Sequence, residues 1–151
     1  MGWFFGFKLH LICNFEGHII AVKITPGNED DRKAFEDLVN RHGLKGKAYA
    51  DKGYIGKDLF KRLWHNGLQL ITGIKKNMQN YLFPWLDKLL LRKRFMIETI
   101  FSRLKEEFNI RPNKHRSPIN FFISLLSALI AYQIKPHKPQ INLKHFSIPY
   151  P

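Results

Sequence analysis

Alternating hydrophobic and polar residues predict a β-hairpin at the start of the chain. Large hydrophobic residues occupy every second position from Phe5 to Leu11, which is the period of a half-buried strand. Turn-forming residues follow over Asn14–Gly17, and His18–Ile24 is a second apolar run. The first strand has no partner N-terminal to it, so we expect a sheet that the chain enters in its middle.

Helical and extended patterns then alternate up to residue 71. Asn28, followed by acidic residues, predicts the start of a helix that ends near Gly43, and a second helix is predicted from about Ile55. Short strands are predicted at 47–50 and 68–71. The apolar faces of the two helices are expected to contain Phe35, Leu38, Val39, Leu59, Phe60, Leu63 and Trp64. The order β-β-α-β-α-β indicates an α/β domain with a mixed sheet.

The second half of the chain is predicted to be mainly helical. Residues 75–88 have an irregular pattern with Pro84 as a stop signal, and residues 89–109 carry the longest helical pattern. Ser117–Ile134 is the longest uncharged run, but Pro118 and several polar residues interrupt it. A membrane-spanning helix needs about 20 mostly apolar residues. We therefore expect a buried or docking helix there and no membrane span.

Length and charge restrict the class of protein. A chain of 151 residues indicates one domain, which we place at residues 1–134, before a Pro-rich, extended tail at 135–151. Twenty-five Lys and Arg residues against 12 Asp and Glu residues give a net charge of +13, so a nucleic acid is the expected partner. The single cysteine, Cys13, excludes an internal disulfide and a thiolate metal cluster. No secretory signal is recognisable, so we expect a soluble cytoplasmic protein.

Asp51 is the first candidate for chemistry. It comes directly after the strand predicted at 47–50 and before the turn at Gly53. In open α/β sheets, ligands and catalytic side chains gather at the carboxyl ends of the strands. The alternative is that Asp51 only caps the following turn, as aspartate often does.

Glu98 is the second candidate, on the helix predicted at 89–109. At about 100° per residue, Arg94, Glu98 and Lys105 fall within roughly 40° of one another. An apolar stripe lies directly beside them and consists of Ile97, Ile100, Phe101, Leu104 and Phe108. Glu98 is therefore expected at the margin of the buried face, as a carboxylate between two cations that could hold a metal beside a phosphate backbone. The alternative is an ordinary i,i+4 ion pair with Arg94.

Four segments together resemble the DDE transposases of bacterial insertion sequences. The sequence Ala-Asp-Lys-Gly-Tyr at Ala50–Tyr54, followed by the spacing Arg-x3-Glu-x6-Lys at residues 94–105, resembles the signature of that family. Gly2–His10 is similar to the family's aromatic second strand, and Thr25–Asp31 is similar to the segment before its first helix. The resemblance covers residues 2–134 in the expected order. It implies an RNase H-like mixed sheet flanked by helices.

The resemblance also implies metal-dependent DNA cleavage and strand transfer. In the family, three carboxylates hold two divalent cations, and Mg²⁺ suits such oxygen ligands. By position, Asp51 corresponds to the second carboxylate and Glu98 to the third, while Arg94 and Lys105 would contact DNA phosphate. The family's tyrosine three residues before the arginine is Leu91 here. The implied partners are transposon-end and target DNA at the nucleoid of a bacterial cell, and the chain could form a homo-oligomer.

The first catalytic aspartate of the family has no counterpart at the start of this chain. In the family it lies on the strand before the hairpin. Asp30 and Asp31 lie in a helix-entry segment, which is the wrong element for that ligand. We therefore expect the chain to be the C-terminal part of a transposase, N-terminally truncated and inactive alone.

Cations cluster along and after the helix predicted at 89–109. Eight of them are expected to form one band that binds DNA phosphate: Arg92, Lys93, Arg94, Arg103, Lys105, Arg111, Lys114 and Arg116. Two alternatives to the enzyme stay open. The chain could be a non-catalytic, basic nucleic-acid-binding protein in which Asp51 and Glu98 are a cap and a surface pair. It could also be a ribosome-associated or oligomer-forming remnant.

Overall fold

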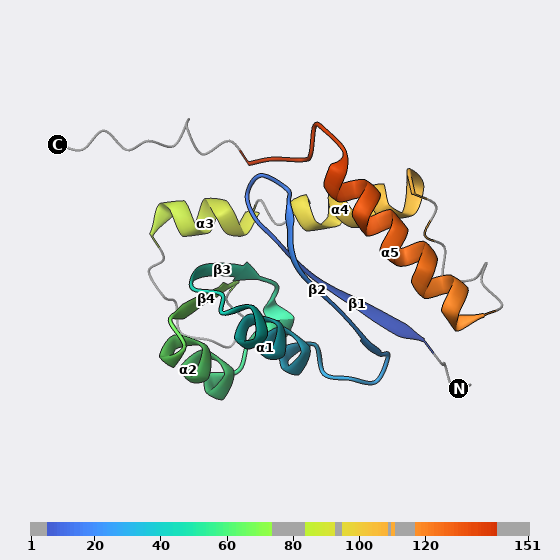
Figure 1. Cartoon of the computed structure of the whole chain (residues 1–151). Helices are drawn as coiled ribbons and strands as arrows, with labels where there is room; N and C mark the ends of the chain where they lie inside the picture. The colour runs from blue at the N-terminus through green and yellow to red at the C-terminus, as the bar shows by residue number, and fades with distance from the viewer. Residues whose placement is uncertain (1–5, 74–83, 93–94, 109, 111–116, 142–151) are drawn as a thin grey trace. The chain divides into compact units, whose positions relative to one another are not determined.

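The computed structural model describes residues 6–73, 84–92, 95–108, 110 and 117–141, and Figure 1 shows their helices and strands. Both kinds of element are present, which confirms the predicted α/β class. The chain divides into two compact units. The first contains Met1–Ile12 and Ile20–Arg94, and the second contains Cys13–Ile19 and Phe95–Pro151. The domain boundary at residue 134 stays a prediction.

The predicted hairpin is present, with strands β1 (Phe7–Cys13) and β2 (Ile19–Pro26). Its turn is shaped by Asn14. The side-chain oxygen of Asn14 accepts hydrogen bonds from the backbone N–H groups of Glu16 at 3.0 Å and His18 at 2.9 Å. Asparagine stabilises turns in this way because its side chain replaces a backbone acceptor.

The buried side of β1 differs from the expectation. The alternating pattern placed Phe7 with the inward residues and His10 with the outward ones, but Phe7 is 52% exposed and His10 is 8% exposed. His10 is buried because its Nε2 atom shares a hydrogen bond of 2.8 Å with the Oγ1 atom of buried Thr25 on β2. A polar pair whose members bond each other can occupy an inward position.

Two helices and two strands follow the hairpin in the first unit. They are α1 (Asp31–His42), β3 (Gly46–Ala50), α2 (Lys57–His65) and β4 (Leu68–Thr72), with a short 3₁₀ helix, η1 (Lys52–Tyr54), after β3. The cap of α1 is Asp30 and not the predicted Asn28, because the carboxylate of Asp30 accepts the N–H of Arg32 at 2.9 Å. α1 ends at Gly43, as predicted, in the left-handed conformation with φ of 59°.

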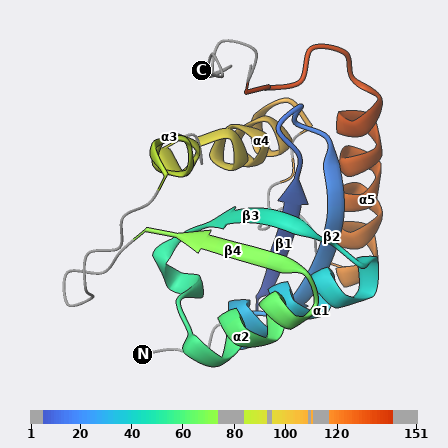
Figure 2. The ribbon, with the colours of Figure 1, turned by 90° about the vertical axis from the view of Figure 1, so that its left-hand side faces the viewer.

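β3 and β4 pair in parallel, from Gly46 opposite Leu68 to Ala50 opposite Thr72. Their carboxyl ends therefore lie at the same edge. Among the described residues, this pair and the hairpin are two separate two-stranded sheets, where a single mixed sheet was predicted. Figure 2 shows α1 and α2 on one side of β3 and β4, and α3 (Trp85–Arg92) on the other.

The core of the first unit lies between α1, α2 and β4. Its buried residues are Phe35, Val39, Leu59, Leu63, Leu68 and Leu70. The predicted apolar faces of both helices are confirmed except at Trp64, which is 64% exposed. Each large apolar side chain contributes about 1.5–3 kcal/mol when it leaves water. This cluster therefore holds both helices on the sheet.

The single helix predicted at 89–109 is two helices. α3 and α4 (Phe95–Glu106) are separated by residues 93–94, which lie outside the described residues. α3 begins earlier than predicted because Pro84 starts it, with the carbonyl of Pro84 accepting the N–H of Asp87 at 3.0 Å. Proline suits the start of a helix, where a backbone N–H would have no partner.

The second unit contains α4, α5 (Pro118–Ile134) and the hairpin turn. The hydroxyl of buried Tyr132 on α5 donates a hydrogen bond to the carbonyl of Gly17 at 2.8 Å. The side chain of Gln133 bonds the backbone N–H and carbonyl of Ile19, at 3.1 and 3.3 Å. Gly17 has a φ of 76°, which a side chain would strain. α5 is thus attached to the backbone of the turn.

The segment after α5 is irregular in its described part and bends at Pro136 and His137, where the φ of His137 is 58°. Residues 135–141 form no helix or strand, and residues 142–151 lie outside the described residues. Lys135 forms an ion pair with Glu107, and the backbone N–H of Ile141 bonds the carbonyl of Phe15 at 2.7 Å. Within the described residues, no helix combines the length and hydrophobicity that a transmembrane segment requires.

The buried His10–Thr25 pair predicts that stability depends on pH. Burial lowers the pKa of His10 below its ordinary value of 6.5, although the carboxylate of Asp31 opposes this shift. Well above pH 6.5 the ring is neutral in both states, and as the pH falls through 6.5 the unfolded chain takes up the proton first. We expect the free energy of unfolding to fall on acidification, by up to about 1.4 kcal/mol per pH unit.

Urea unfolding between about pH 7.5 and pH 5.5 measures this free energy. The control is His10→Gln, which keeps a hydrogen-bonding group beside Thr25 and does not titrate in this range. Its pH dependence should be shallower than that of the wild type. Equal slopes in the two proteins would contradict the prediction.

Candidate active site

Asp51 lies at the carboxyl edge of the parallel pair, directly after β3. Its backbone is extended, with φ of −74° and ψ of 164°, and its side chain is exposed. One carboxylate oxygen accepts the backbone N–H of Lys52 at 2.6 Å and so caps η1. Asp51 therefore caps the turn and also occupies the strand end where ligands gather in α/β sheets.

η1 ties Asp51 to the core of the first unit. The ring of Tyr54, at the end of η1, packs edge-on against Phe35 with 5.4 Å between ring centroids. Burial, together with the carboxylates of Asp31 and Asp51, raises the pKa of Tyr54. The Tyr54 hydroxyl is therefore neutral at physiological pH, and the aromatic contact holds the residues after β3 in place.

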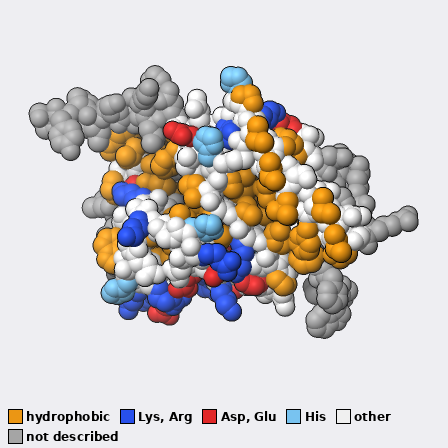
Figure 3. All heavy atoms as spheres, in the orientation of Figure 1, with side chains coloured by type: hydrophobic (Ala, Val, Ile, Leu, Met, Phe, Trp, Pro, Cys, Tyr) orange, Lys and Arg blue, Asp and Glu red, His pale blue; other side chains and the backbone are white. Residues whose placement is uncertain are grey.

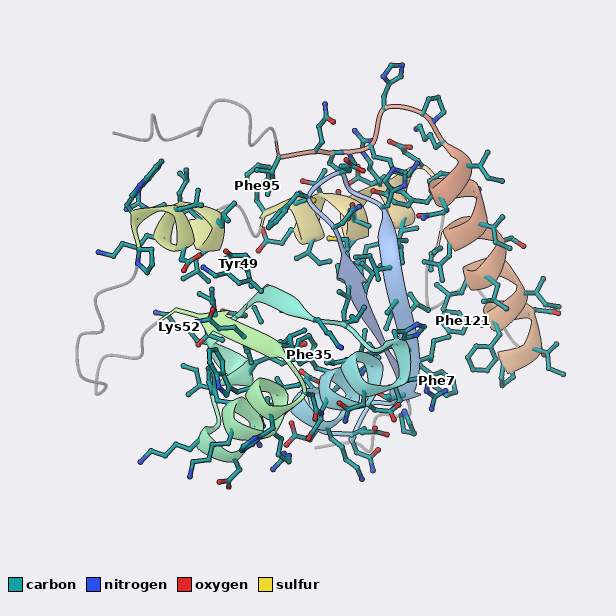
Figure 4. All side chains as sticks on the ribbon, turned by 60° about the vertical axis from the view of Figure 1, so that its left-hand side comes forward. Phe7, Phe35, Tyr49, Lys52, Phe95 and Phe121 are labelled. Carbon is teal, nitrogen blue, oxygen red and sulfur yellow. The ribbon has the colours of Figure 1, made fainter. Side chains whose placement is uncertain are left out.

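Lys52 lies across the end of β4 at the same edge. A Cβ atom on Gly73 would lie 3.0 Å from Cε and 3.4 Å from Cγ of Lys52, so the lysine stem fills the space beside Gly73. Figure 4 shows Lys52 at this end of the sheet. Lysine stems cover neighbouring surface while the ammonium group stays in water. This edge therefore carries a cation next in sequence to the Asp51 carboxylate.

Asp87 is a buried carboxylate that the sequence pattern did not reveal. It lies on α3 with 2% exposure, accepts the hydroxyl of Tyr49 at 2.7 Å, and accepts Nζ of Lys47 at 3.0 and 3.1 Å. Buried charges are paired in this way because water no longer solvates them. Burial and the bond to Asp87 raise the pKa of Tyr49. The sequence signal is an aspartate within an apolar helical run, in a segment that we predicted to be irregular.

The Asp87 contacts fix α3 to one face of the sheet. Side chains alternate along a strand, so Lys47 and Tyr49 point to the same side of β3, and both reach Asp87 on α3. Figure 4 shows Tyr49 between β3 and α3. The first unit thus presents an exposed carboxylate, Asp51, directly after a strand that a buried ion pair fixes to α3.

Glu98 lies in the first turn of α4 and is exposed, so its predicted position at the margin of the buried face is wrong. The buried face of α4 consists of Met96, Ile100 and Leu104, while Ile97 is only partly buried. Because Met96 is buried, the centre of the buried face lies on the far side of the helix from Glu98. At about 100° per residue, Glu98 is roughly 160° from that centre. A carboxylate in the first turn is favoured by the helix dipole.

Two of the predicted DNA-binding cations lie on α4. Arg103 is half-buried, donates to the carbonyl of His137 at 3.0 Å, and forms an ion pair with Glu107 at 3.8 Å. Lys105 is exposed in the last turn. Arg92 is exposed at the end of α3. The other predicted contacts lie outside the described residues, and they are Lys93, Arg94, Arg111, Lys114 and Arg116. Whether these cations form one band stays a prediction.

Asp51 and Glu98 are candidate metal ligands from different units, Asp51 from the first and Glu98 from the second. The described residues contain no group of three or more His, Cys, Asp or Glu side chains that could hold a metal ion. Carboxylate oxygens are ligands that Mg²⁺ prefers, and both carboxylates are exposed. Their donor chemistry therefore fits the predicted cation.

Comparison with protein families gives a match over most of the chain. The family described as transposase DDE domain matches residues 1–118, a range that contains both Asp51 and Glu98. The chain belongs to the transposase DDE domain family. No curated protein and no solved structure matches it.

Membership of the DDE domain family confirms the coarser part of the sequence interpretation, a transposase domain whose family carries out DNA transposition. The hairpin, α1, α2 and the candidate carboxylates of the DDE domain all lie inside the matched range. Except for Pro118, α5 lies outside it. The roles of Asp51 and Glu98 as metal ligands, and of the cations as DNA contacts, stay predictions.

Removal of the Asp87 carboxylate should destabilise the DDE domain. In Asp87→Leu, the hydroxyl of Tyr49 loses a charged acceptor away from water, and we expect the free energy of unfolding to fall by about 2 kcal/mol. In that variant the side chain of Lys47, which is 46% exposed, can return to water. Lys47→Met instead leaves the buried Asp87 carboxylate without its cation, and we expect it to cost more, about 3 kcal/mol. Urea unfolding of both variants checks this, and a smaller loss in Lys47→Met than in Asp87→Leu would contradict a role centred on the buried carboxylate.

Proposed function

We propose that this chain is the catalytic part of a transposase that cleaves DNA and joins the ends to target DNA in a metal-dependent reaction. The match to the transposase DDE domain family over residues 1–118, which include Asp51 and Glu98, carries this proposal. The position of Asp51 at the carboxyl edge of β3 and β4 supports it, because catalytic side chains of open α/β sheets gather there.

Asp51 and Glu98 would supply two of the three carboxylates that the family resemblance implies. Both are exposed oxygen donors, as Mg²⁺ requires. When bound, a metal pair activates the attacking oxygen and stabilises the leaving oxygen in a displacement at phosphorus. The residues of the chain position the two carboxylates. The contact of Tyr54 with Phe35 holds the turn after Asp51, and the first turn of α4 holds Glu98.

An RNase H-like sheet is part of the proposal. Among the described residues, β1 pairs with β2 and β3 pairs with β4. A further strand between β1 and β3 would join the two pairs into one mixed sheet, and an aspartate on that strand would supply the third carboxylate. In this proposal the chain contains the DDE domain of a bacterial insertion-sequence transposase, and the domain acts together with such a strand.

Exposed cations would supply the DNA contacts. The chain carries a net charge of +13, and Lys105 is exposed on α4, as is Arg92 on α3. Arg103 already pairs with Glu107 and His137, so we expect it to contribute less. The remaining proposed contacts come from Arg94, Arg111, Lys114 and Arg116.

Duplex binding should weaken steeply with salt and depend little on base sequence. Each cation that neutralises a phosphate releases a counterion, which contributes a slope of about −0.9 to the plot of log K against log salt. Lys105→Gln should therefore reduce the slope by about 1, and Arg103→Gln should reduce it less. Fluorescence anisotropy with two unrelated duplexes, between about 50 and 200 mM salt, measures this. Equal affinity at both salt concentrations would contradict phosphate binding.

The purified chain alone should bind DNA without nicking it in Mg²⁺ or Mn²⁺. Two carboxylates provide too little negative charge to assemble a metal pair against the hydration of Mg²⁺. A segment that carries an aspartate-bearing strand, placed before residue 1 or added in trans, should restore cleavage. Nicking of supercoiled plasmid is the measurement.

Substitutions in the cleaving protein then test each carboxylate. Asp51→Asn and Glu98→Gln should each lower cleavage by orders of magnitude, because the groups of such a site act as a unit. Asp58→Asn, an exposed aspartate in the first turn of α2, is the matched control and should leave cleavage unchanged. Mn²⁺ titration by electron paramagnetic resonance should show weaker binding in the first two variants and not in the control.

Two results would contradict these assignments. Cleavage that survives both Asp51→Asn and Glu98→Gln would exclude them as essential ligands. DNA binding without cleavage under all of these conditions would favour the non-catalytic, basic nucleic-acid-binding protein.

A further inference from the structure

A stripe of large aliphatic side chains is exposed along α5. The α5 stripe consists of Ile119, Ile123, Leu126, Ile130 and Ile134, which are between 53% and 77% exposed. Figure 3 shows hydrophobic side chains gathered over this helix. Monomeric soluble proteins rarely expose a contiguous apolar patch of more than a few hundred Å². The stripe therefore marks an interaction surface.

The α5 stripe is separate from the face that α5 uses inside its own unit. That inner face contains Leu125, Ala128, Leu129 and Tyr132. At about 100° per residue, the centre of the stripe lies roughly 150° from the centre of the inner face. The bond of Tyr132 to Gly17 holds the inner face on the hairpin turn, and exposed Gln133, which bonds Ile19, lies between the inner face and the stripe. The stripe is thus preformed, and a partner would not have to order it.

The absence of charge on α5 restricts the class of molecule that could bind the stripe. No charged residue occurs from Pro118 to Ile134, although the chain has a net charge of +13. A DNA backbone or an acidic protein would find no cation to pair with on this helix. An uncharged apolar face is complementary to a second copy of itself, because neither copy has to remove a charge from water when the two helices meet.

The spacing of the α5 stripe also fits a second helix. Its residues follow one another at intervals of four, three, four and four. Ile123, Leu126 and Ile130 have the three- and four-residue intervals of a coiled-coil seam, with isoleucine and leucine alternating as in two-stranded coils. The stripe has five residues, against roughly 20–30 per partner in a standard interface. An interface this small suits a weak dimer, with a dissociation constant on the order of micromolar.

We propose that two copies of this chain pair through their α5 stripes to form a symmetric dimer. The surface involves neither Asp51 nor Glu98, and it lies outside the residues that match the family. The proposal is therefore independent of the proposed function. Either one can fail while the other holds.

Sedimentation equilibrium of the intact chain tests the dimer. At about 0.5 M salt, which screens the repulsion between two basic copies, the wild type should show a monomer–dimer equilibrium. Ile123→Glu and Ile130→Glu should each raise the dissociation constant by about 100-fold or more, because pairing would bury the new charge. Ala131→Glu is the matched control. Ala131 is exposed on the same helix, roughly 100° from the centre of the stripe, and this variant should still dimerise.

A cysteine in the α5 stripe gives a second, independent measurement. Leu126 lies at the middle of the stripe, so Leu126→Cys in a Cys13→Ser background brings two thiols together in either orientation of the paired helices. Oxidised glutathione should then yield a disulfide-linked dimer, and Ala131→Cys in the same background should stay unlinked. Circular dichroism verifies that every variant keeps the helix content of the wild type.

Four outcomes would overturn the proposal. The first is a wild-type chain that stays monomeric at about 100 μM, well above the expected dissociation constant. The second is a dimer that survives both glutamate substitutions in the stripe. The third is equal loss of the dimer in Ala131→Glu. The fourth is a monomeric chain that sediments with phosphatidylcholine vesicles through the same residues, which would assign the stripe to a lipid surface.

Discussion

The buried carboxylate of Asp87 fixes how the first unit is arranged around its candidate site. An aspartate with 2% exposure has to be paired, and its partners Lys47 and Tyr49 are two residues apart on β3. A shift of one residue in β3 would turn both partners to the opposite face. Asp51 follows directly after this strand. One buried charge therefore fixes the register of the strand that leads to Asp51.

The second unit depends on bonds to backbone atoms instead. Tyr132 and Gln133 bind carbonyl and N–H groups of the hairpin turn, so most side chains of the turn are free to vary. Asn14 and Gly17 are the exceptions. The side chain of Asn14 accepts two backbone N–H groups of the turn, and Gly17 has a φ of 76° with the carbonyl of Pro139 close to where a Cβ atom would be. The α5 stripe makes none of these bonds, which come from Tyr132 and Gln133.

Local signals predicted the hairpin, α1, α2 and the parallel strands, because turns, caps and short apolar runs act over a few residues. Asp51 could be recognised as the residue after a strand for the same reason, because the strand signal lies in the residues directly before it. The errors arise where a partner is distant in sequence. His10 is buried by Thr25, fifteen residues away, and Asp87 by Tyr49, thirty-eight residues away. Glu98 was misplaced because periodicity alone did not show that Met96, rather than Ile97, lies on the buried face.

The second unit combines two segments that are far apart in the sequence, and this separation determines the order in which its parts can fold. The turn at Cys13–Ile19 is synthesised early, but its partners Tyr132 and Gln133 follow 115 and 114 residues after the atoms that they bind. Contacts so distant in sequence form slowly, because chain entropy is lost before the contact stabilises the fold. During synthesis the first unit can form its core before α5 is made, and only then can the turn form its bonds to α5. A ribosome that stalls before residue 118 would therefore hold a hairpin whose strands are folded and whose turn still lacks the helix that fastens it.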